Sequence, residues 1–113
     1  MSYSLDGLQM NAVHTASTGV VNAETIFEFH QTGSHVHASY AGGRVVRGFL
    51  VGKVEGARLE FRYCQLHEDG ELDGGHSVCE LQRSDEGLLQ IVEHFDWDGG
   101  QGTNVIQELP PTA

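Results

Sequence analysis

Hydrophobic and polar residues alternate through most of this chain, in segments separated by glycine-containing turns such as Asp69-Gly70 and Glu86-Gly87. Such alternation is typical of antiparallel strands that place one face on a core and the other in solvent. Short strands at even spacing predict a β-meander, closed as a barrel or folded as a sandwich. The eight strands that we predict span residues 5–14, 24–31, 35–41, 44–54, 58–67, 72–83, 88–97 and 103–109.

Eight strands of this length can close into a barrel whose interior is filled mainly by side chains. The predicted fold is therefore all-β, a single antiparallel up-and-down β-barrel of about eight strands, with a meander like that of lipocalins or streptavidin. We expect one domain over residues 1–113, in which 110–113 form a short tail. No segment carries the apolar stripe of an amphipathic helix, so helix content should be low. Residues 12–24 are the most favourable place for a short helical turn.

The alternation also predicts which side chains point inward. On residues 58–67 the inner set is Leu59, Phe61, Tyr63 and Gln65, and on 88–97 it is Leu89, Ile91, Glu93, Phe95 and Trp97. On residues 44–54 we place Val46, Gly48, Leu50 and Gly52 inside, because glycine suits a curved wall and Arg47 prefers solvent. This register needs a three-residue turn with a bulge over residues 42–44.

Several of these inward positions are polar. A carboxylate at Glu93, between Ile91 and Phe95, must be hydrogen-bonded, hydrated or raised in pKa. If the polar groups converge, they form an apolar pocket with a few oriented polar atoms, which is typical of a small-molecule site. The alternative is a polar network that plugs one end of the barrel. The lumen candidates are Tyr40, Tyr63, Gln65, Glu93, Trp97 and, as a second carboxylate, Glu108.

Three histidines form a weaker candidate site. A two-residue turn at Thr32-Gly33 would set His30 opposite His35 and a carboxylate opposite His37, and these are ligand types that suit a transition metal. The same face lies opposite the apolar side of its strand, so we expect a solvated face and no bound metal. No motif for a phosphate or a dinucleotide is present, and no cofactor is expected.

Composition narrows the partners. The chain has 113 residues and a formal net charge of −10, and we interpret its six Lys and Arg as scattered along the sequence. An acidic protein without a basic groove repels phosphate backbones, so nucleic acid is not an expected partner. No apolar run reaches the roughly 20 residues of a membrane-spanning helix, and no secretory signal is visible, so we expect a cytoplasmic protein. A homodimer is compatible with the sequence. Cys64 and Cys79 are expected to be reduced, with a disulfide across paired strands as the alternative.

Three functions follow from these residues. The first is a small-molecule binding module that uses the barrel lumen or mouth. The second is an enzyme in which Glu93 is the general acid or base, working with Tyr63 and Glu108. The third is a structural or oligomeric protein with a filled barrel and no ligand. The catalytic templates that we searched, the nucleophile elbow and the P-loop, are missing, so we favour binding over catalysis.

One combination of segments resembles a known family. These segments are Tyr40-Ala41-Gly42-Gly43, Gly48-x-Leu50-x-Gly52, Arg62-Tyr63-x-Gln65, Gly70-Glu71-Leu72, Glu93-x-Phe95-x-Trp97 and Glu108-Leu109. Together they resemble small bacterial proteins that often carry the name N-acetylglutamate synthase. Acetyltransferases of that kind are α/β proteins that hold the cofactor's pyrophosphate at a helix N-terminus. The strand pattern here offers no such helix, so we expect neither that activity nor acetyl-CoA binding.

Overall fold

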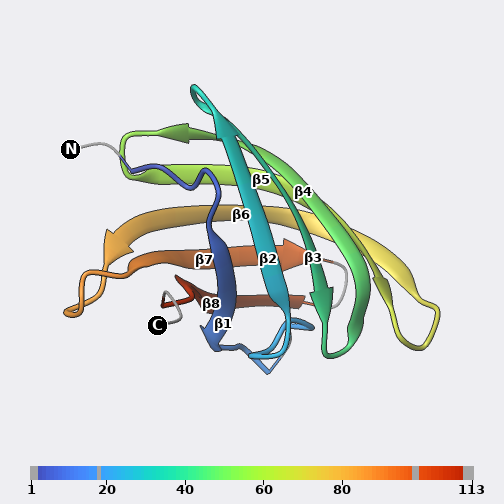
Figure 1. Ribbon diagram of the computed structural model, residues 1–113. Helices are drawn as coiled ribbons and strands as arrows, with labels where there is room; N and C mark the ends of the chain where they lie inside the picture. The colour runs from blue at the N-terminus through green and yellow to red at the C-terminus, as the bar shows by residue number, and fades with distance from the viewer. Residues whose placement is uncertain (1–2, 18, 98–99, 111–113) are drawn as a thin grey trace.

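The computed structural model describes residues 3–17, 19–97 and 100–110. Within them, eight antiparallel strands follow one another around a closed barrel, and the first strand pairs with both the second and the last (Figure 1). The strands are β1 (Gln9–His14), β2 (Ile26–Thr32), β3 (His35–Gly42), β4 (Val45–Glu55), β5 (Arg58–His67), β6 (Leu72–Arg83), β7 (Leu89–Trp97) and β8 (Gly100–Glu108). The predicted fold class is confirmed.

The predicted strands agree with the observed ones to within two residues, except for β1 and for β8, which begins at Gly100 instead of at residue 103. Residues 5–8 form a turn, in which the Leu8 amide donates to the Leu5 carbonyl at 3.1 Å, and Gly7 has φ of 76°. A positive φ is readily available only to glycine, so the chain turns here and β1 begins at Gln9. The helical turn expected within residues 12–24 is wrong, because the described part of that range is strand and loop. The described residues contain no helix long and apolar enough to cross a membrane.

The hairpin between β2 and β3 corrects the predicted register of the histidines. Its two turn residues are Gly33 and Ser34, and Gly33 has φ of 59°. Glycine with positive φ at the first central position is typical of a type II′ hairpin turn. The turn therefore lies one residue later than predicted. His30 pairs with His37, and His35 pairs with Thr32.

The start of β4 corrects one predicted facing. Gly48 and Leu50 face inward as predicted, but Val45 is 2% exposed while Val46 is 52% exposed. The pairing of β4 with β5 shifts between Val45 and Arg47, so two consecutive side chains point outward at this irregularity. The turn before β4 has two residues, Gly43 and Arg44, instead of the predicted bulged loop of three.

One end of the barrel is closed by the N-terminal segment. Leu5 is fully buried against the core, and its amide donates to the side-chain oxygen of Gln31 at 2.9 Å. Gly7 and Leu8 form backbone hydrogen bonds with Phe29 of β2. This closure leaves the opposite end, where the loop from β1 to β2 runs, as the end at which a site could open (Figure 1).

The inner faces predicted for β5 and β7 are confirmed. Leu59, Phe61 and Gln65 are buried, as are Ile91 and Phe95. The two cysteines lie on opposite sides of the wall. Cys79 is buried, Cys64 is exposed, and both are free thiols. A disulfide between them is therefore excluded in this fold.

Candidate functional site

A cavity lies in the barrel toward the end opposite the N-terminal segment. Its closed interior is small, about 30 Å³, and the hollow reaches about 370 Å³ of space free of protein atoms when the open solvent at its mouth is included. Five of the six predicted lumen residues line it: Tyr40, Tyr63, Gln65, Glu93 and Trp97. They come from β3, β5 and β7, so residues far apart in sequence are brought together by the inward alternation of neighbouring strands.

Glu93 is buried in the lumen, with 7% of the residue exposed. The Ser77 hydroxyl donates to its Oε2 at 2.6 Å, and the Asn104 amide donates to its Oε1 at 3.1 Å. The buried carboxylate is hydrogen-bonded, as one of the predicted alternatives requires, and its two donors come from β6 and β8. Burial raises the pKa of Glu93, and the two hydrogen bonds partly oppose that shift.

Asn104 connects this carboxylate to the loop between β1 and β2. Its Oδ1 accepts a hydrogen bond from the Ala16 amide at 3.0 Å, which fixes the direction of its side-chain amide. Gly19, Val20 and Val21 of the same loop line the cavity. Neither the role of Asn104 nor that of the loop was predicted from the sequence. The inward position of Asn104, two residues before the buried Ile106, was available from the alternation of β8. The path of the loop was not.

A second group of connected polar side chains extends from the cavity wall toward the loop between β5 and β6. The Tyr40 hydroxyl donates to Gln65 Oε1 at 2.9 Å, and Gln65 Nε2 donates to Asp73 Oδ1 at 3.1 Å. Asp73 Oδ2 then lies 2.8 Å from His67 Nε2, and both side chains are buried. The geometry between Asp73 Oδ2 and His67 Nε2 is not that of a hydrogen bond. The His67 ring stacks on Trp97, with 6.0 Å between centroids.

Aromatic rings form most of the remaining wall. Phe27 stacks on Tyr40 with centroids 4.6 Å apart, and Phe61 meets Tyr63 edge to face at 6.0 Å. Burial raises the pKa of both tyrosines, and the nearby charge of Glu93 raises it further. Both hydroxyls therefore stay protonated at neutral pH and act as neutral hydrogen-bonding groups.

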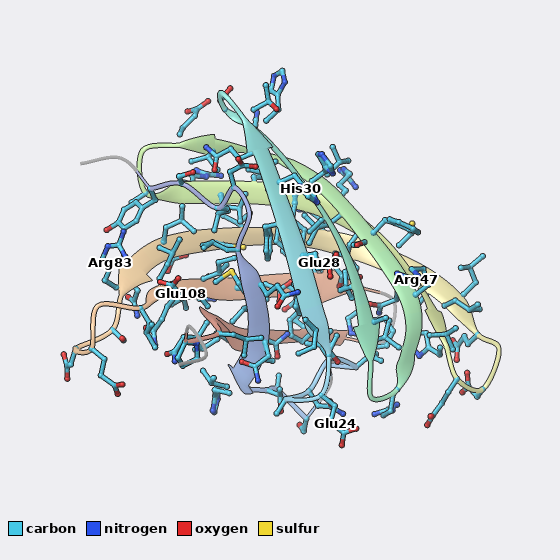
Figure 2. The ribbon with its side chains drawn as sticks, viewed as in Figure 1. Glu24, Glu28, His30, Arg47, Arg83 and Glu108 are labelled. Atoms are coloured by element: carbon cyan, nitrogen blue, oxygen red, sulfur yellow. The ribbon has the colours of Figure 1, made fainter. Side chains whose placement is uncertain are left out.

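Glu108 does not belong to this cavity. Its Oε1 accepts the Leu89 amide at 2.7 Å, at the closed end of the barrel (Figure 2). Asn104, the partner of Glu93 across the strands, lies four residues earlier on β8, which corresponds to about 13 Å along a strand. The hypothesis that Glu108 is a second carboxylate in the lumen is wrong, because Glu108 lies farther along β8 than the residues that line the cavity.

The histidine candidates lie on the outer wall. His30 and His37 are exposed, with their rings stacked at 5.0 Å between centroids. His35, which is also exposed, lies opposite Thr32. In the described residues, no group of three or more His, Cys, Asp or Glu side chains is arranged to hold a metal ion.

The basic residues are less scattered than we interpreted them to be. Five of the six Lys and Arg fall between Arg44 and Arg62, and Arg47, Lys53 and Arg62 lie on the outer wall of β4 and β5. Phe49 and Val51, which are 55% and 67% exposed, share that wall. The expectation of no nucleic-acid partner therefore rests on the net charge alone.

Comparison with known families agrees with this geometry. A family model described as "Avidin-like protein" matches residues 3–109. The chain belongs to the avidin-like family. The predicted likeness to the streptavidin barrel agrees with this family. The lipocalin barrel, which was the other predicted likeness, is a related but distinct fold. Searches of the curated proteins and of the solved structures gave no match.

Proposed function

We propose that this avidin-like barrel binds a small molecule in the cavity at its open end. The observation that carries the proposal is the convergence of an aromatic wall with the oriented polar groups of Gln65, Glu93 and Asn104 around one cavity. Small-molecule sites are concave, mostly apolar and furnished with a few polar groups that fix orientation. Avidin-like barrels bind small molecules such as biotin, which supports the same assignment.

The hydrogen bonds already present favour a preformed site. Glu93 is held by two donors and Gln65 by a donor and an acceptor, so their polar atoms have fixed directions before a ligand enters. A preorganised pocket loses less side-chain freedom on binding than a flexible one does. The cost of binding is correspondingly lower.

The test is native mass spectrometry of freshly purified protein, followed by fluorescence titration. Trp97 is the one tryptophan of the chain and lines the cavity, so its emission reports occupancy. We expect a small molecule that leaves on unfolding and whose return changes the Trp97 emission. Biotin is the first probe to titrate.

A matched pair of variants locates the binding. Val21→Phe should narrow the cavity and weaken the fluorescence response, whereas Val13→Phe, on the outer side of β1, should leave it unchanged. Protein that carries no small molecule, and whose emission responds neither to biotin nor to a metabolite extract, would favour the filled-barrel alternative.

We also expect no binding of acetyl-CoA at millimolar concentration. The pyrophosphate of that cofactor needs a helix N-terminus or an equivalent group of amides, and the described residues contain no helix. Isothermal titration calorimetry checks this expectation. An isotherm with micromolar affinity would show that a nucleotide cofactor can bind a β-barrel of this size.

A further inference from the structure

The charges around the cavity are of one sign. Glu93 is the one Asp or Glu among the described residues that line the cavity, and no Lys, Arg or His lines it with Glu93. Its two hydrogen-bond donors, Ser77 and Asn104, are neutral. An ionised carboxylate in an apolar setting is costly unless a cation pairs with it. The lumen therefore contains a carboxyl group with which no Lys, Arg or His side chain among the described lining residues is paired.

The walls are suited to a cation as well. Six aromatic side chains line the cavity: Phe27, Tyr40, Phe61, Tyr63, Phe95 and Trp97. The faces of aromatic rings carry partial negative charge and attract ammonium groups, more strongly when the group has lost its water. A carboxylate beside several rings thus offers both an ion pair and cation–π contacts to one positive group.

Acidic residues at the open end of the barrel add a negative electrostatic potential. The described residues of the loops at this end carry four exposed carboxylates, those of Glu24, Glu68, Asp69 and Glu71. Glu24 lies at the end where the β1–β2 loop runs (Figure 2). Arg44 is the one Lys or Arg in the described residues of these loops. Together with a formal net charge of −10, this arrangement attracts cations to the mouth and repels anions.

We propose that the lumen ligand is an organic cation, an amine or quaternary ammonium compound, whose positive group pairs with Glu93 inside the aromatic wall. This inference rests on the proposed function, because it assigns a ligand class to the same cavity. It specifies charge where the proposed function specifies only size and location.

The test compares three probes of similar shape that differ in charge: phenethylamine, phenethyl alcohol and 3-phenylpropanoate. Calorimetry and Trp97 emission are recorded at mildly alkaline pH, because burial raises the pKa of Glu93 and an alkylamine is still protonated there. We expect the amine to bind at least about tenfold tighter than the alcohol, and the anion to bind weakest. Equal affinity for the amine and the alcohol would overturn the inference.

Two variants assign the preference to Glu93. Glu93→Gln should lower the affinity for the amine about tenfold and leave that for the alcohol within about twofold. Glu28→Gln removes the same charge from the exposed face of β2 and should leave the affinity for the amine unchanged. Equal losses in the two variants would mean that net charge alone attracts the amine, which contradicts the pairing with Glu93.

The outcomes separate the two proposals. If uncharged or anionic probes bind in the cavity as well as the amine does, the lumen is a binding site and the assignment of a cation is wrong. If no probe changes the Trp97 emission and the purified protein carries no small molecule, both proposals are wrong.

Discussion

Replacing Gly42 with alanine is expected to destabilise the barrel by about 2–6 kcal/mol. A Cβ atom there would lie 2.0 Å from the carbonyl oxygen of Glu24, and Gly42 has φ of 120°. The clash is with backbone, which cannot rotate away, and overpacking of this kind costs about 1–3 kcal/mol. A sparsely populated φ adds about 1–3 kcal/mol. Urea denaturation would measure the change.

The matched control is Gly33→Ala. Gly33 also has a positive φ, of 59°, but a Cβ atom there would have no neighbour within 4 Å. The Gly33→Ala variant should lose only the stability that the unfavourable φ costs, about 1–3 kcal/mol. Equal losses at Gly33 and Gly42 would show that the loop between β1 and β2 moves freely away from β3. The Thr25 hydroxyl, which donates to the Gly42 carbonyl at 3.1 Å, argues against such freedom.

Glu93→Leu is the second large change that we predict, with a loss of about 1–3 kcal/mol. Leucine cannot accept the hydrogen bonds of Ser77 and Asn104, so two buried donors lose their partner. Glu93→Gln should keep the fold, because its amide oxygen can accept from Asn104 and its NH₂ can donate to the Ser77 hydroxyl. Equilibrium unfolding of both variants tests this difference. A leucine variant as stable as the glutamine variant would mean that water takes over the two donors.

The stability of the glutamine variant relative to wild type should depend on pH. The pKa of Glu93 is raised in the folded protein, so below about pH 4 the carboxyl is protonated whether folded or unfolded and costs nothing extra. As the pH rises, the unfolded state ionises first and wild type loses stability until the folded pKa is passed. Glu93→Gln should therefore gain on wild type between about pH 4 and the folded pKa. A difference that is constant from acidic to alkaline pH would contradict the raised pKa.

The strand order and most inward faces could be predicted from the sequence because both depend on local alternation. Leu59, Phe61 and Gln65 follow a period of two, and the closed barrel allows one inner face for each strand. The errors lie where one extra residue enters the pattern. The shift between Val45 and Arg47 reverses the facing of Val46, and a turn one residue later, at Gly33-Ser34, moves the partner of His30 by two residues, from His35 to His37.

The candidate site could be predicted in part for the same reason. Glu93 was located by its inward position, but its partners lie on other strands, and their identity depends on the register across β6, β7 and β8. Ser77 reaches Glu93 only because of that register. The β1–β2 loop contributes Gly19 and Val20 through a path that follows no periodic pattern. Long-range register and irregular loops are therefore the parts that sequence reasoning left open.

The closed pairing of β1 with β8 limits how this protein can associate with other chains. Among the eight described strands, each one pairs with a neighbour on both sides, so no strand has a whole edge free, although Gly100–Asn104 of β8 pair only with β7. Strand addition and amyloid-like stacking both begin at such a free row of amides and carbonyls. Contacts between folded copies would therefore rely mainly on side chains of the outer wall, and Phe49 and Val51 are its most exposed apolar residues between β3 and β5.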